Sequence, residues 1–463
     1  MTVSVRAEMA HLVEAAIAAV RPEALVPRRI ECRGGELLLD QAPFAEAVRL
    51  AGRIVVIGGG KAAAGMAAAV EAVLVPAIAG GADVRGLVSV PEGCGRRLVH
   101  VEVRETRPAG VNLPTPAAVA ATAGMIGAVA ALGPDDLAIV IVTGGGSALL
   151  ESPHVGVSLD DLIAVTRFLS AAGADIRELN LVRQALSAAK AGGLARACKA
   201  GRLVALVLYD VIGDPLDLIS SGPCMPAPAD PSAALSILRR HAALDVAPHL
   251  TRFLERAAAE GLPPASHAAG GEWTTPSDCR VSHVLLGSNA TAVDAAARTA
   301  RDLGYDVTIR HAVSASETAE SVGRRLAAEA AELCAAAGRD GRPRSVIEGG
   351  EAVVTVPRDH GTGGRNQQTV LAAVEAWRRA GEPWPVGLTI TSIGTDGEDG
   401  PTDAAGGFVD DHVAERLSGE GIDVARAVAR CDAYPALAAA DGLIRTGPTG
   451  TNVADVRMIL ARP

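Results

Sequence analysis

The segment "IVVIGGGKAAAGMA", residues Ile54–Ala67, is an apolar run that ends in three glycines and a lysine before an alanine-rich stretch. This order predicts a buried strand, a tight turn and a helix. Gly58, Gly60 and Ala63 also fit the G-x-G-x-x-G/A spacing of a dinucleotide-binding turn. Lys61 lies inside the same turn, where its cation could meet a transferring phosphoryl group. The segment therefore leaves two ligands open: a nicotinamide dinucleotide, or a nucleotide whose phosphates are split.

Short apolar runs alternate with longer, alanine-rich segments of helical period along the whole chain, and two examples of the latter are Leu159–Ala171 and Ile176–Lys190. This alternation predicts an α/β protein with a mainly parallel sheet and helices on both of its faces. Because 463 residues exceed one ordinary core, we expect two domains. The proline cluster from Pro223 to Pro231 indicates the boundary between them. We therefore expect a Rossmann-like N-terminal domain over 1–230 and a second α/β domain over 231–463.

The overall composition excludes several classes of partner. The net charge of -10 argues against a nucleic-acid backbone, and 2% of aromatic residues offers few platforms for stacking bases. No apolar stretch approaches the ~18 residues of a membrane span. The seven cysteines are scattered, as expected in a reducing compartment, and residues 4–20 predict an amphipathic helix, available to pack on the second domain, rather than a signal peptide. We therefore expect a cytoplasmic protein without nucleic-acid or membrane partners.

A second triple-glycine turn follows the apolar run "IVIVT", just before Ser147. In an open parallel sheet, ligands bind at the carboxyl ends of the strands, where glycine turns let the backbone approach an anion. Two such turns after two apolar strands favour ligand binding over a merely tight connection. The candidate nucleotide- and phosphate-binding residues are Gly58, Gly59, Gly60, Gly144, Gly145, Gly146, Ser147 and Asn289.

The dinucleotide interpretation needs an acidic residue after the next strand, to bind the ribose hydroxyls. Glu92 is the available candidate, and it follows a proline. A pyrophosphate bridge relies on the helix dipole, whereas a transferring phosphoryl group needs a movable cation such as Lys61. The turn therefore favours phosphoryl transfer, and the nicotinamide cofactor stays as the alternative.

Two aspartates, Asp210 and Asp214, follow another apolar strand in "LYDVIGDPLDL". Mg²⁺ takes few protein ligands when it also binds substrate phosphates, and paired carboxylates at a strand end suit it. The two residues are tentative Mg²⁺ ligands, with loop capping as the alternative.

The second half of the chain contains further polar turns. Glu351 precedes a glycine-rich turn that ends in Arg365 and Asn366, and an arginine there is either surface charge or a clamp for carboxylate or phosphate. The later segment "TSIGTDGEDGPTDAAGG" carries Asp396, Glu398, Asp399 and Asp403 among glycines and lacks the order of an EF-hand loop. These residues are candidates for binding a metal or the substrate.

Taken together, six motifs resemble the glycerate 2-kinases with a C-terminal MOFRL domain, a family in which some members are labelled hydroxypyruvate reductases. The motifs are "IGGGKAAAGMA", "VTGGGSALLE", "DVIGDPLDLISSGP", "GGRNQQ", "GTDGEDGPTDAAG" and "TGPTGTNVADVRMIL". The resemblance implies transfer of the γ-phosphoryl group of ATP, with Mg²⁺, to the 2-hydroxyl of D-glycerate. It implies a Rossmann-like domain, a MOFRL-like region over about 343–460 and a cleft between the domains. It also implies catalytic roles for Lys61 and Arg365; a homodimer is expected as well.

Five positions depart from the family pattern. Arg107 and Asn112 replace a histidine and an aspartate, Ala185 and Gly193 replace a histidine and an arginine, and Glu348 replaces a serine. The glycine turns are kept, so we expect family-like use of ATP and Mg²⁺. The lost polar groups leave the acceptor open between D-glycerate and a larger hydroxy acid. They also leave open a nucleotide-binding paralogue without catalysis.

Overall fold

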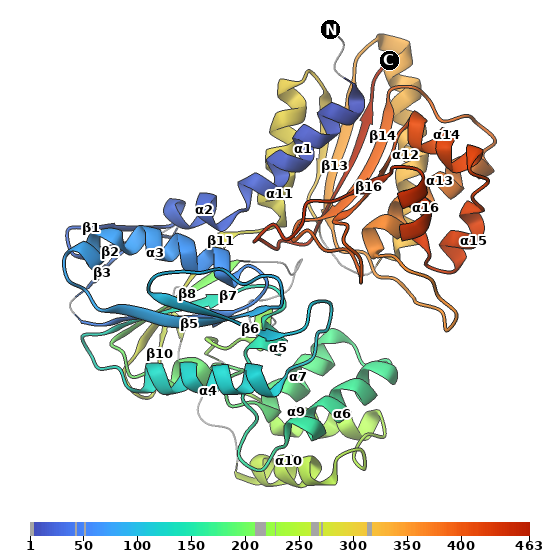
Figure 1. Cartoon of the computed structure of the whole chain (residues 1–463). Helices are drawn as coiled ribbons and strands as arrows, with labels where there is room; N and C mark the ends of the chain where they lie inside the picture. Colours follow the sequence, from blue (N-terminus) through green and yellow to red (C-terminus); the bar gives the residue numbers. More distant parts are fainter. Residues whose placement is uncertain are drawn as a thin grey trace. The chain divides into compact units, whose positions relative to one another are not determined.

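A computed structural model of the chain describes residues 4–41, 44–50, 52–208, 219–226, 228–260, 268–269, 272–312 and 317–463. The described residues form two compact units, shown in Figure 1. The N-terminal unit runs from Leu25 to Leu286, and the C-terminal unit combines the chain up to Ala24 with the chain from Gly287 onward. The predicted two-domain α/β architecture is confirmed. The division after Leu286 differs from the expected boundary at residue 230.

An eight-stranded sheet forms the centre of the N-terminal unit. Its strands, in spatial order, are β6 (Val101–Arg107), β5 (Val84–Pro91), β4 (Ile54–Gly59), β7 (Leu137–Val142), β8 (Arg202–Leu208), β11 (Arg280–Gly287), β10 (Glu272–Thr274) and β9 (Ala268–Ala269). Strands β6, β5, β4, β7 and β8 are parallel to their neighbours, which is the order 3-2-1-4-5 of a doubly wound Rossmann fold. The last three strands explain the shifted boundary, because residues after the proline cluster extend this sheet.

The central strands β4, β7 and β8 are buried at every residue, as expected for strands covered on both faces. Figure 1 shows α3 (Ala63–Ala79) and α4 (Pro116–Ala130) on opposite faces of the sheet. The other helices are α5 (Gly146–Leu149), α6 (Leu159–Ala171), α7 (Ile176–Leu186), α8 (Gly193–Ala197), α9 (Pro231–Arg240) and α10 (Pro248–Glu260). The described residues also form a short helix α2 (Pro22–Leu25) and the 3-10 turns Val26–Arg28 and Ile219–Ser221. Strands β1 (Ile30–Arg33), β2 (Glu36–Gln41) and β3 (Phe44–Arg49) form a separate antiparallel sheet.

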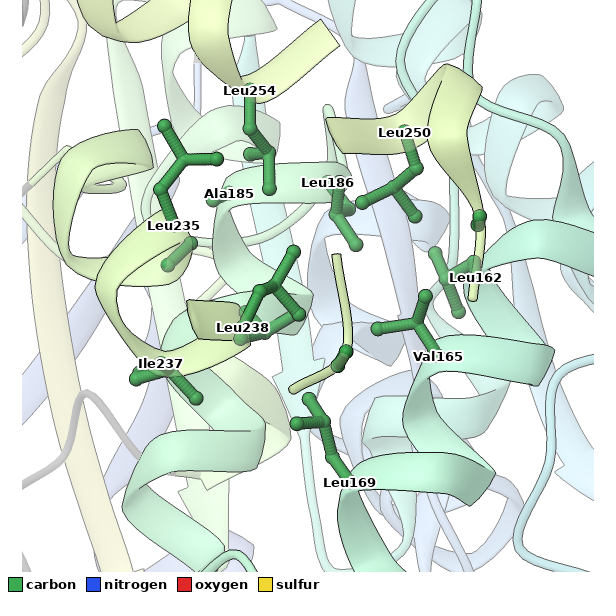
Figure 2. Packing of buried hydrophobic residues seen from close by; sticks show 14 of the residues in the cluster. Leu162, Val165, Leu169, Ala185, Leu186, Leu235, Ile237, Leu238, Leu250 and Leu254 are labelled. Carbon is green, nitrogen blue, oxygen red and sulfur yellow. The ribbon is translucent and has the colours of Figure 1, made fainter. Parts of the chain in front are cut away.

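Helices α6, α7, α9 and α10 pack on one another through an apolar cluster. Figure 2 shows Leu162, Leu186, Leu238 and Leu250 from these four helices pointing toward one another. Helix α7 begins with a capping box, in which Asp175 and Glu178 satisfy free backbone amides. It ends at Leu186 rather than at the expected Lys190, because Ser187 adopts an extended conformation.

The C-terminal unit has a mixed six-stranded sheet. Its strands, in spatial order, are β12 (Asp306–Arg310), β13 (Arg344–Gly350), β17 (Asp455–Ala461), β14 (Leu388–Gly394), β15 (Gly406–Val409) and β16 (Leu443–Ile444). The helices are α1 (Val5–Ala19), α11 (Asn289–Asp302), α12 (Ala319–Asp340), α13 (Arg365–Arg379), α14 (Asp411–Gly419), α15 (Val424–Ala429) and α16 (Ala433–Ala439). Only β12 and β13 are paired in parallel; the other pairs are antiparallel.

The N-terminal helix α1 packs on α11 and is anchored by a buried acid. Glu8 accepts hydrogen bonds from Tyr305 Oη at 2.6 Å and from Arg462 Nε at 2.9 Å. These contacts join the start of the chain to its last strand region. Within the described residues, no helix is both long enough and apolar enough to cross a bilayer.

Candidate active site

The two glycine turns lie side by side at the point where the strand order of the parallel sheet reverses. One turn follows β4 and the other follows β7, and these neighbouring parallel strands pair from Ile54 with Leu137 to Gly59 with Val142. In doubly wound folds this switch point is where the crevice for a ligand opens. The topology therefore confirms that both predicted turns reach the same edge of the sheet.

Backbone contacts hold the turns together and require glycine there. Lys61 donates its backbone N–H to the Gly144 carbonyl at 2.9 Å, and Ala62 donates to Thr143 Oγ1 at 3.3 Å. A Cβ atom at Gly60, whose φ is +138°, would lie 1.9 Å from Thr143 Oγ1. The glycine is thus needed for the close approach of the two turns as well as for its φ.

Two cationic side chains converge on the second turn. A Cβ atom at Gly145 would lie 3.4 Å from Arg107 Nη2 and 3.4 Å from Lys61 Cγ. Arg107 stands at the end of β6 and is buried, and its Nη1 donates to the carbonyls of Pro108 and Val111. Arg107 therefore places a second cationic side chain beside Lys61. Such a pair can stabilise an anion that sits against the glycine turns.

A set of serines backs the second turn. Ser147 Oγ lies 3.3 Å from Ser221 Oγ, which donates to Asn180 Oδ1 at 3.0 Å. Ser220 Oγ donates to the Thr143 carbonyl at 3.1 Å. Ser220 and Ser221 have φ values of 51° and 60°, a left-handed conformation that is unfavourable for serine. Residues held in such strained conformations are concentrated at functional sites.

A buried ion pair between Lys190 and Glu151 contacts the backbone that follows the second glycine turn. Lys190 Nζ lies 3.0 Å from Glu151 Oε2 and donates to the carbonyls of Ser147 and Leu150, each at 2.9 Å. Burial lowers the pKa of the Lys190 ammonium, and the Glu151 charge opposes this shift. The lysine is satisfied within the protein, so its role is to position the turn.

In the C-terminal unit, Arg365 is the first residue of α13. Its Nε and Nη2 donate to the two oxygens of Asp455 at 2.7 and 2.8 Å, and its Nη1 lies 3.2 Å from Glu351 Oε1. Burial lowers the pKa of Arg365, but the charge and hydrogen bonds of Asp455 raise it well above the ordinary value. The structure thus holds a permanently charged guanidinium at a fixed place.

A second buried carboxylate caps the same helix. Asp399 accepts hydrogen bonds from the backbone N–H groups of Asn366 and Gln367 at 3.0 and 2.8 Å. Asn366 Nδ2 also donates to Asp399 and to Asp455, at 3.3 and 3.1 Å. Burial raises the pKa of Asp399 to about 6, and the neighbouring Asp455 charge adds to this effect. The predicted residues Arg365 and Asn366 therefore lie together with the carboxylates of Asp399 and Asp455.

Other predicted residues of this unit have structural partners. Asn289 is buried and donates to the carbonyls of Val453 and Asp455, each at 2.9 Å. Asp403 accepts hydrogen bonds from Tyr434 and Arg445. The carboxylate of Asp396 accepts from the backbone of Glu398 and, with Glu351, adds negative charge near Arg365. The ligand-binding roles of these residues stay predictions.

The proposed Mg²⁺ ligands Asp210 and Asp214 lie outside the described residues. Within the described part of the chain, no three His, Cys, Asp or Glu residues form a group that could hold a metal ion. Carboxylates of the described residues therefore supply no ready-made metal centre.

The positions that depart from the family pattern are dispersed. Ala185 and Gly193 line one cavity of about 480 Å³, together with Phe253 and Arg256. Ala185 also packs into the apolar cluster of Figure 2. Asn112 is exposed. These two positions therefore border the same space within the N-terminal unit.

Glu348 belongs to a buried ion network of the C-terminal unit. Arg325 donates to its two oxygens at 2.8 and 2.9 Å, and Arg457 Nη1 lies 3.3 Å from Oε1. The charge of Glu348 is thus balanced by arginines of the protein, and its presence needs no bound ligand to explain it.

Several residues of the two sites are absent from the sequence-based predictions, namely Glu151, Asn180, Lys190, Ser221 and Asp455. Their roles depend on partners far away in sequence. Asp399 was predicted with Asp396 and Asp403 as part of one acidic turn, and its contact with Asn366 follows from the structure.

Comparison with known proteins gives a consistent result. Residues 8–255 match the family described as domain of unknown function DUF4147, and residues 344–455 match the MOFRL family. The glycerate kinase of Homo sapiens is 33% identical over 98% of this chain and 92% of its own length. The glycerate 2-kinase of Pyrococcus horikoshii is 34% identical over 96% of this chain and 94% of its own length.

Two further proteins extend the comparison. A putative hydroxypyruvate reductase of Agrobacterium vitis is 36% identical over 88% of this chain and 99% of its own length. The crystal structure of a glycerate kinase from Thermotoga maritima superposes with a TM-score of 0.77, at 32% identity and 98% coverage of both chains. The chain belongs to the glycerate 2-kinase family with a C-terminal MOFRL domain.

Proposed function

We propose that this protein transfers the γ-phosphoryl group of ATP to the 2-hydroxyl of D-glycerate. The observation that carries the proposal is the convergence of Lys61 and Arg107 on Gly145, between two glycine turns at the switch point of the sheet. The names of the relatives support the same activity.

The phosphates of ATP would lie against the second turn, because a Cβ atom at Gly145 would lie 3.4 Å from both Arg107 Nη2 and Lys61 Cγ, and two cationic side chains there attract an anion. In the reaction, the acceptor oxygen bonds to the γ-phosphorus, the bond from that phosphorus to the bridging oxygen breaks, ADP departs with this oxygen, and the hydroxyl proton is released to solvent. Phosphoryl transfer depends mainly on positioning and on neutralising charge. Lys61 and Arg107 serve this purpose in the N-terminal unit, and we assign the same role to Arg365 in the C-terminal unit.

Mg²⁺ bound with ATP would neutralise further phosphate charge, and Asp210 and Asp214 are the carboxylates that we propose for it. A cytoplasmic location and a homodimer stay predictions.

Lys61→Ala tests the proposal. Loss of one transition-state cation lowers kcat by about 10²–10³. The matched control is Lys199→Ala, because Lys199 is exposed and its backbone N–H, which the substitution keeps, donates to the Val129 carbonyl. A folded Lys61→Ala protein with the turnover of the control would remove the assigned role.

The alternative function is an NAD(P)H-dependent hydroxypyruvate reductase. The relative from Agrobacterium vitis carries that name as a putative one, and Glu92 directly follows β5, where a Rossmann enzyme binds the ribose. This enzyme would oxidise NAD(P)H with hydroxypyruvate and need neither ATP nor Mg²⁺. A paralogue without catalysis would bind ATP with no turnover in either assay.

The cavity beside Ala185 and Gly193 bears on the choice of acceptor. Comparison of kcat/KM for D-glycerate with that for four-carbon and larger hydroxy acids decides whether the lost polar groups changed the specificity. A kcat/KM for D-glycerate that is about 100 times higher than for the larger hydroxy acids would refute the hypothesis of an altered acceptor.

A further inference from the structure

Arg183, on α7, is a partly buried arginine. It forms no hydrogen bond or ion pair with another residue of the described ranges. Burial lowers the pKa of its guanidinium, and the charge of Glu151 opposes this shift. Withdrawing a cation from water without a bound anion is unfavourable, and a bound anion would compensate for it.

The helix places Arg183 close to the second glycine turn. Asn180 precedes Arg183 by three residues, and residues at this spacing are neighbours on a helix surface. Asn180 Oδ1 accepts a hydrogen bond from Ser221 Oγ, which lies 3.3 Å from Ser147 Oγ. Gln184, the next residue, donates to the Ser221 carbonyl at 3.3 Å. This part of α7 is therefore fixed against the serines that back the turn.

Among the described residues, the group of Arg183, Lys190 and Glu151 carries two positive charges and one negative charge. Glu151 is already paired with Lys190 at 3.0 Å, and the positive charge of Arg183 contributes to lowering the pKa of Lys190. Two cations thus share one carboxylate in a region of low solvent access. A single additional carboxylate would balance the group.

We infer that Arg183 binds the carboxylate of the hydroxy acid acceptor. The inference rests on the proposed function and names the subsite that recognises the acceptor's charge. The planar guanidinium matches a carboxylate with two parallel hydrogen bonds, which an ammonium group cannot offer. An acceptor held there by its carboxylate lies near the Ser147 turn, on which we place the ATP phosphates. A phosphate group of the nucleotide would suit the same cation, so the experiment separates the two anions.

The experiment compares D-glycerate with its uncharged amide as acceptors, for the wild type, Arg183→Ala and Arg183→Gln. Loss of a charged hydrogen-bond partner is expected to raise KM for D-glycerate about 30- to 100-fold, with KM for ATP changed less than about threefold. The preference of the wild type for the acid over the amide should fall to near unity in both variants. Arg177→Ala, an exposed position of the same helix, is the matched control and keeps wild-type values.

A rise in KM for ATP in place of that for D-glycerate would assign Arg183 to the nucleotide and overturn the inference. Unchanged KM values for both substrates would overturn it as well. Thermal unfolding shows which of the two variants is folded. If Arg183→Ala does not fold, the comparison is made with Arg183→Gln.

Calorimetric titration with D-glycerate separates this inference from the proposed function, since it needs no turnover. Binding to the wild type that is lost in Arg183→Gln supports the subsite even if no phosphoryl transfer occurs. Equal binding to both proteins, or none to the wild type, contradicts it.

Discussion

Arg365 and Asp455 form a two-pronged ion pair in which the carboxylate is completely buried, with N–O distances of 2.7 and 2.8 Å. The pair joins the start of α13 to the start of β17. It fixes the guanidinium of the proposed catalytic arginine before any substrate binds, which is the condition for electrostatic stabilisation without reorganisation.

Arg365→Ala is expected to change both activity and stability. It removes a transition-state cation, so kcat should fall by about 10²–10³. It also leaves Asp455 buried without its counter-ion, which should cost about 3 kcal/mol of unfolding free energy. Urea denaturation and steady-state kinetics measure the two effects. Arg358→Ala, at an exposed arginine in the preceding connection, is the control, and a variant of Arg365 that matched it in both assays would refute the assignment.

Asp399 predicts a specific dependence of stability on pH. Its pKa is about 6 in the folded protein, against 3.8 for an ordinary aspartate. The folded state therefore binds this proton more tightly than the unfolded state. The stabilisation is complete below pH ~4 and is lost as the pH rises to ~6, by a total of about 3 kcal/mol. The difference in unfolding free energy between the wild type and Asp399→Asn should thus decrease over this window. A difference that is flat or increasing with pH would contradict the prediction.

Gly60→Ala should disrupt the contact between the two glycine turns. The added Cβ would lie 1.9 Å from Thr143 Oγ1, and the φ of +138° is unfavourable for alanine. We expect a destabilisation of about 2 kcal/mol or more and a large loss of ATP affinity. Gly127→Ala in α4 is the matched control, because its Cβ meets nothing within 4 Å. That control should be neutral or stabilising by up to ~1 kcal/mol. Equal ATP binding by both variants would show that the turns do not hold the phosphates.

Glu151→Gln should be strongly destabilising, because it leaves the Lys190 ammonium buried without a counter-ion. Breaking one partner of such a pair costs about 3–5 kcal/mol, whereas removing both costs less. The double variant Glu151→Gln with Lys190→Met should therefore recover part of the loss. Unfolding free energies of the four proteins give the coupling energy. Additive effects of the two substitutions would mean that the pair is not coupled.

The strand, turn and helix predicted from residues 54–67 correspond to β4 and α3, because a local apolar run and its glycines determine this unit. The domain boundary was not predictable in this way. Prolines between Pro223 and Pro231 interrupt local structure, but membership of a sheet depends on pairing with distant strands. Strand β11 joins the N-terminal sheet beside β8, so the chain stays in that unit until Leu286.

The candidate site shows the same limit. Glycine turns and Lys61 are visible in the sequence, since they follow apolar strands directly. The functions of Asp455 and Lys190 are not, because each depends on a partner 40 or more residues away, Arg365 for the first and the Ser147 and Leu150 carbonyls for the second. The acidic turn after β14 was recognised, but which of its carboxylates meets Asn366 follows only from the three-dimensional structure, in which it is Asp399.

The most direct test of the proposed activity is the identification of the product. The purified protein is incubated with ATP, Mg²⁺ and D-glycerate, and the mixture is followed by ³¹P NMR. The account predicts that 2-phosphoglycerate and ADP accumulate in equal amounts and that no NAD(P)H is needed. Oxidation of NAD(P)H by hydroxypyruvate with no release of ADP, or no turnover at all, would contradict it.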